Sequence, residues 1–181
     1  MNRRAIKRLA TRSIPLVLLI LAASWSLLPV TGLRIVDGDS SSTLLLLCFA
    51  PEEPFTIAFI HSIAKRPVEE TLHVRNADGM IVLDTVVWDM NGAGLPYEAE
   101  PGMVFEVKDG KYVLSRMNRE FAEILQAVGT VADHHLVCGE RTLALERLVE
   151  PGEAIRLKSA RLPKLVFWCA RLRWLKLSEP L

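Results

Sequence analysis

The residues whose side chains are best suited to catalysis or ligand binding lie on either side of a short turn. His61 and Ser62 end an apolar run, and Glu69 and Glu70 open the next segment. A histidine, a hydroxyl and a carboxylate are the parts of an activated nucleophile. Neighbouring residues on a strand point to opposite faces, however, so His61 and Ser62 diverge. We therefore predict no catalytic set here and interpret these four residues as ligand or partner contacts.

Two further groups of residues could form a binding site. His134 and His135 add permitted metal ligands, but their spacing is not diagnostic, and we expect a surface His134, a packed His135 and no metal. A loop with Asn91, Gly92 and Gly94 offers backbone N–H groups to an anion, yet it lacks the Lys-Ser/Thr of a phosphate loop. A turn that needs glycine φ angles explains the same residues. We keep all three as candidate contacts.

Two alternating segments must position the His and Glu residues. Residues 55–61 and 68–74 both alternate between apolar and other side chains, as half-buried strands do. An antiparallel hairpin turning at residues 65–66 would set His61 opposite Glu70 at the rim of the core. The sequence thus predicts a hydrogen-bonded ion pair, with a ligand-reading role as the alternative.

The rest of the chain carries strand and turn signals. Buried or alternating strands are expected at 43–49, 80–90, 134–149 and 153–160, and Asp109-Gly110 suits a two-residue type I′ turn within 103–117. The spacing of apolar residues over 118–129 predicts a helix. We expect a mainly β domain, an antiparallel β-sandwich or partly open barrel with one short helix, preceded by one N-terminal transmembrane helix.

The chain of 181 residues has a formal net charge of +1, and its charge is unevenly placed. Residues 1–12 are basic, and residues 13–33 carry no charge, which suits a span of about 20 residues. Positive charge before the span keeps that end cytoplasmic. We predict an inner-membrane anchor at 13–33, a linker at 34–42 and a periplasmic β-domain at 43–160. A cleaved signal segment, with release to the periplasm, is the alternative, and export excludes a nucleic-acid partner.

A basic aromatic tail follows, at residues 161–181. Aromatic and basic side chains together suit a membrane surface or an acidic partner, and a helix packed on the sandwich explains them equally well. The chain has 3 cysteines, Cys48, Cys138 and Cys169, which leave the disulfide state open. No cofactor motif is present in the sequence.

The series FTIAFIHS, PVEE and GAGLP, within residues 55–96, resembles a family of exported bacterial proteins known as domain of unknown function 1850. The likeness continues more weakly to about residue 158. Members are similar in having an N-terminal membrane segment and are often encoded beside TRAP transporters with TAXI-type solute receptors. The resemblance implies an accessory role in solute uptake, with a TRAP membrane subunit or solute receptor as partner.

Three functions are compatible with these features. The first is a membrane-anchored periplasmic accessory or binding module whose contacts centre on His61, Glu70 and the loop at 91–96. The second is a small periplasmic enzyme, a hydrolase or a metal-dependent one, that uses His61 and Glu70. The third is a structural envelope protein whose basic tail binds anionic lipid.

Overall fold

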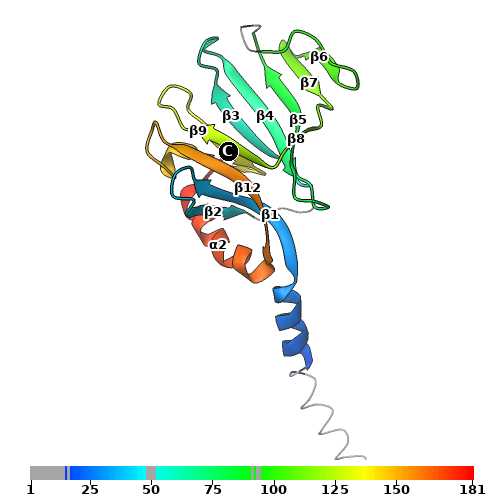
Figure 1. Ribbon diagram of the computed structural model, residues 1–181, viewed down its shortest axis with the longest axis vertical. Helices are drawn as coiled ribbons and strands as arrows, with labels where there is room; N and C mark the ends of the chain where they lie inside the picture. Colours follow the sequence, from blue (N-terminus) through cyan, green and yellow to red (C-terminus); the bar gives the residue numbers. More distant parts are fainter. Residues whose placement is uncertain (1–14, 16, 48–51, 91, 93–94) are drawn as a thin grey trace, which may run out of the picture.

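Antiparallel strands make up most of the computed structural model, which describes residues 15, 17–47, 52–90, 92 and 95–181 (Figure 1). The strands are β1 (Pro29–Asp37), β2 (Thr43–Leu47), β3 (Phe55–Ile60), β4 (Pro67–Val74), β5 (Ile81–Trp88), β6 (Val104–Lys108), β7 (Lys111–Ser115), β8 (Arg119–Phe121), β9 (Glu123–Ala127), β10 (His135–Cys138), β11 (Arg141–Ala144), β12 (Ala154–Pro163) and β13 (Glu179–Pro180). The fold is mainly β, consistent with a β-sandwich or open barrel.

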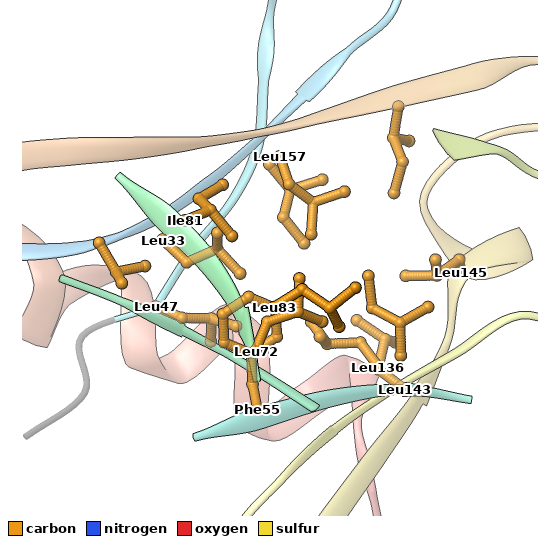
Figure 2. Packing of buried hydrophobic residues seen from close by; sticks show 14 of the residues in the cluster. Leu33, Leu47, Phe55, Leu72, Ile81, Leu83, Leu136, Leu143, Leu145 and Leu157 are labelled. Atoms are coloured by element: carbon orange, nitrogen blue, oxygen red, sulfur yellow. The ribbon is translucent and has the colours of Figure 1, made fainter. Parts of the chain in front are cut away.

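The strands form two sheets around one core. The smaller sheet has the order β2-β1-β12-β9, and the larger has the order β13-β11-β10-β3-β4-β5-β7-β6, with β8 paired to β5. Leu33 of β1 and Leu157 of β12 face Leu72 of β4 and Leu136 of β10 across the interior, and all four are at most 1% exposed (Figure 2). Burying this apolar area is the main force that holds the two sheets together.

The predicted hairpins are confirmed where turn residues define them. Asp109 and Gly110 have φ angles of 53° and 77°, as a type I′ turn requires, and Lys108 pairs with Lys111 across it. β10 and β11 form the hairpin expected after residue 134, with Cys138 opposite Arg141. β2 covers most of the strand expected at 43–49, and Cys48 lies outside the described residues.

The helix predicted at 118–129 is wrong, because this segment forms β8 and β9. Phe121 of β8 pairs with Ile81 of β5 in the larger sheet, and Gln126 of β9 pairs with Ile155 of β12 in the smaller one. The segment therefore passes from one sheet to the other. Backbone pairing with two open strand edges outweighs a helical spacing of apolar side chains.

The helical part of the N-terminal apolar stretch ends earlier than expected. Residues 17–27 are helical, but residues 29–37, expected to be partly span and partly linker, form β1. β1 pairs with β12 along its whole length, from Pro29 opposite Pro163 to Asp37 opposite Ile155. Within the described ranges, no helix combines the length and apolar character needed to cross a membrane.

The expected basic tail is part of the folded domain. Helix α2 (Lys164–Leu177) packs on β2 and β12, and it buries Phe167 and Trp174. The helix comes so close to β1 that a Cβ added to Gly32 would lie 2.7 Å from a ring carbon of Phe167. After α2 the chain returns to the larger sheet, where β13 pairs with β11.

Candidate functional site

A cavity of about 570 Å³ opens between the two sheets. Its polar lining consists of His61, Ser62, Glu70, Arg119, Gln126 and His134. Its apolar walls include Phe59, Val68, Leu83, Val86, Leu95 and Met117. Pockets of this size with apolar walls and a few polar groups are typical sites for small molecules.

His61 begins the turn that joins β3 to β4. Its backbone closes the turn, since the N–H of His61 donates to the Arg66 carbonyl at 2.8 Å and its carbonyl accepts from Lys65 at 2.8 Å. Its Nδ1 accepts hydrogen bonds from the backbone N–H groups of Ile63 and Ala64, at 3.3 and 3.2 Å. Because Nδ1 is an acceptor, the neutral ring carries its proton on Nε2, which is left as a donor.

The predicted His61–Glu70 ion pair is wrong, because the hairpin register differs. Phe55 pairs with Leu72, and Ile57 pairs with Glu70, so His61 lies beyond the last paired residue of β3. No hydrogen bond or ion pair joins His61 to Glu70 in the described part of the chain. The shift keeps the same faces inward, and it moves the centre of the turn from residues 65–66 to residues 63–64. His61 and Glu70 share a cavity but do not touch.

Glu70 is the carboxyl group of this cavity. It lies on β4 between Ile57 of β3 and Val86 of β5, and no described residue gives it a hydrogen bond or a counter-charge. Burial raises the pKa of Glu70, because the apolar surroundings disfavour its charged form. Glu69 points to the opposite face, where its carboxylate lies 3.5 Å from the Lys111 ammonium, and it does not line the cavity.

The expectation of a surface His134 and a packed His135 is wrong, because the two are reversed. His134 is 8% exposed and stacks on Phe59, with ring centroids 5.5 Å apart. Gln126 donates to its Nε2 at 2.8 Å, so the neutral ring carries its proton on Nδ1, which is buried without a partner. Burial lowers the pKa of His134. His135 is one-third exposed and contacts Asp133 at 2.9 Å.

The glycine loop lies against the His61 turn. A Cβ added to Gly92 would lie 3.2 Å from the Ala64 Cβ, and the Gly92 carbonyl accepts from Leu95 N–H at 3.2 Å. Leu95 and Pro96 carry the loop into the cavity wall. Asn91 and Gly94 lie outside the described residues. The structure thus brings Gly92 next to the turn, and His61, Ser62 and Glu70 into one cavity.

The sequence does not indicate Arg119 and Gln126 as site residues, because both lie in the segment whose apolar spacing predicts a helix. Arg119 is held by Glu100, with a nitrogen–oxygen distance of 2.9 Å. The burial of His134 could be predicted from the sequence, because the apolar Leu136 lies two positions later and therefore on the same face of the strand. Its position on the core side follows from that alternation.

The groups that line the cavity are hydrogen-bonding side chains set among apolar ones. Ser62 is exposed and makes no hydrogen bond to His61 in the described part of the chain. Among the described residues, no group of three His, Cys, Asp or Glu side chains could hold a metal ion. The side chains instead present one unpaired carboxyl and several hydrogen-bonding groups to an apolar hollow.

Comparison with known proteins shows that the cavity lies within the stretch of the chain that matches a family. No curated protein and no solved structure matches the chain. β1, β12 and α2 lie outside the stretch that matches a family model, whereas every residue that lines the cavity lies inside it. That stretch, residues 55–145, matches the family described as a domain of unknown function (DUF1850), and the chain belongs to this family.

Proposed function

We propose that this domain is a binding module that takes a small organic cation with an apolar portion into the cavity between its sheets. The observation that carries the proposal is the unpaired carboxyl of Glu70 in an apolar cavity of about 570 Å³. Glu70 is half-buried, and removing its carboxylate from water costs free energy. A ligand that donates a charge-assisted hydrogen bond to Glu70 would offset that cost.

The other lining groups limit the shape of such a ligand. Phe59 and Val86 offer apolar contact, and the Phe59 ring is already stacked on His134. His61 presents its Nε2–H as a donor, and Arg119 adds a guanidinium whose charge Glu100 balances. A primary amine joined to a short apolar chain, with an acceptor at its other end, satisfies all of these groups.

We also propose a setting for this module. The domain would stand on the periplasmic face of the inner membrane, anchored through the part of the uncharged stretch that precedes β1, and serve a TRAP-type transporter as an accessory subunit. The basic residues before the uncharged stretch and the resemblance over residues 55–96 support this setting. Light crosslinking in cells, followed by purification and mass spectrometry, should recover a transporter membrane subunit or solute receptor. Recovery of this chain alone would contradict the setting.

Binding is tested with the full chain in mild detergent and a panel of small primary amines of increasing apolar length. Isothermal titration calorimetry should detect saturable binding by at least one amine. Glu70→Gln should weaken it about 10- to 100-fold, because a hydrogen bond to a charged group is lost. Glu69→Gln is the matched control, since Glu69 lies on the outer face.

The proposal fails if no amine binds, or if Glu70→Gln binds as tightly as the unchanged chain. Mass spectrometry of the recovered amine separates binding from turnover. Chemical conversion of the amine that depends on both His61 and Glu70 would instead support the alternative, a small periplasmic enzyme.

A further inference from the structure

Helix α2 has two apolar faces, of which only one packs on the domain. Phe167 and Trp174 form the buried face. The exposed face carries Leu165, Trp168, Leu172 and Leu175, which are 46%, 50%, 66% and 41% exposed. Their spacing of three, four and three residues places them on one continuous stripe of a helix. We call these four residues the α2 stripe.

Basic residues border the α2 stripe on both sides. With 3.6 residues per turn, Lys164 and Arg171 lie along one edge, and Arg173 and Lys176 lie along the other. Long basic side chains next to an apolar stripe can keep their charges in a polar layer while their stems cover apolar surface. This is the pattern of a helix that lies in the plane of a membrane interface.

The α2 stripe continues into the N-terminal helical segment. The Trp25 and Trp168 rings lie 5.3 Å apart, and the Lys164 ammonium lies 3.9 Å from the centre of the Trp25 ring. The helical residues leave the body of the molecule beside α2 (Figure 1). The large apolar side chains of residues 17–28 are all about half exposed or more: Val17, Leu18, Leu19, Ile20, Leu21, Trp25, Leu27 and Leu28. Together they make an apolar surface far larger than scattered exposed residues explain.

We propose that the α2 stripe binds the surface of an anionic phospholipid bilayer, with Trp25 and Trp168 at the level of the headgroups. Tryptophan is enriched at that depth. Each basic residue near an anionic surface contributes about 1 kcal/mol of attraction. A second copy of the chain fits poorly, because it would set the same four cations opposite each other. The inference does not depend on what the cavity binds.

Spin labelling of the full chain tests this contact. The label is placed at Leu172→Cys in a chain that also carries Cys169→Ser, and the Cys169→Ser chain alone measures background labelling. Background should be low at Cys138, because burial raises the pKa of that thiol to about 12. A label at Val107→Cys is the control, since Val107 is 65% exposed and β6 lies at the opposite end of the molecule from α2 (Figure 1).

In vesicles of phosphatidylcholine and phosphatidylglycerol, the label at 172 should gain collisions with oxygen and lose collisions with a water-soluble nickel complex severalfold, relative to the label at 107. This difference in collisions between the labels at 172 and 107 should shrink in vesicles of phosphatidylcholine alone. It should also shrink with Arg171→Glu plus Lys176→Glu, and persist with Lys65→Glu plus Lys108→Glu. Equal nickel collisions at 172 and 107 would overturn the inference, as would a contrast that ignores lipid charge. Spin–spin broadening that disappears on dilution with unlabelled chain would show a second copy on the stripe instead, and would also overturn it.

Discussion

At the scale of single residues, the burial of Glu70 makes the stability of the domain depend on pH. Its pKa is raised above the ordinary value of 4.5, so the unfolded chain releases this proton at a lower pH than the folded chain does. The free energy of unfolding therefore falls as pH rises from about 4.5 through the folded pKa. His134, whose pKa is lowered by burial, acts in the other direction and costs stability as pH falls below 6.5. A comparison that changes Glu70 alone separates the two effects.

Glu70→Gln should stabilise the domain at pH 7, although it weakens the proposed cation binding. The uncharged amide relieves the desolvation of the carboxylate, and we expect a gain on the order of 1 kcal/mol. Urea unfolding at pH 7 and at pH 4 measures it. The gain should vanish at pH 4, where both states of the unchanged chain hold the proton. Equal midpoints at pH 7 for Glu70→Gln and the unchanged chain, with Glu69→Gln as control, would show that Glu70 has an unseen partner.

At the scale of elements, one side chain fixes the end of α2. Arg141 of β11 donates to the Ser178 carbonyl at 2.6 Å, to the Ser178 hydroxyl at 2.7 Å and to the Leu175 carbonyl at 3.1 Å. The last carbonyls of a helix have no partner within the helix, and they carry partial negative charge. Arg141 therefore links the larger sheet to the C-terminal end of α2.

Arg141→Ala should loosen the last turn of α2 and cost about 1.5–3 kcal/mol, the range for hydrogen bonds from a charged group. Hydrogen exchange followed by mass spectrometry should show faster exchange in peptides that cover residues 172–181. Arg147→Ala is the matched control, since Arg147 makes one exposed ion pair, to Glu179 at 2.9 Å. Such a pair contributes about 0–1 kcal/mol. Unchanged exchange in Arg141→Ala would mean that packing of Trp174 alone holds the helix end.

Elements with local signals could be predicted from the sequence, and those set by distant pairing could not. Asp109-Gly110 dictates its own hairpin through its φ angles, so the turn alone was sufficient. Residues 118–129 contain a helical spacing, and only the edges of β5 and β12 turn them into strands. The residues of the cavity were likewise predictable only in part. Alternation places Glu70 inward, but the pairing of Ile57 with Glu70 depends on the length of the turn, which alternation does not determine.

At the scale of the molecule, segments from either side of the family stretch form the centre of the smaller sheet. β1 and β12 pair over nine positions, from Pro29–Pro163 to Asp37–Ile155, and α2 covers them with Phe167 packed against Gly32. Lys164 N–H also donates to the Leu28 carbonyl at 3.1 Å. The stretch that matches the family model begins only at residue 55, so Leu33, Leu157 and Trp174 of the shared core come from segments outside it.

Truncated chains test that dependence. A chain of residues 28–181 should unfold cooperatively, because it keeps the whole of β1. A chain of 34–181 loses the fully buried Leu33 and more than half of the β1–β12 pairs, and a chain of 28–160 loses Phe167 and Trp174. Removing one large buried side chain costs about 2–5 kcal/mol, against a total stability of about 5–15 kcal/mol for a domain. Both shorter chains should therefore lose the cooperative transition seen by circular dichroism in urea. If 28–160 unfolded at the same urea concentration as 28–181, α2 would contribute nothing to the stability of the domain.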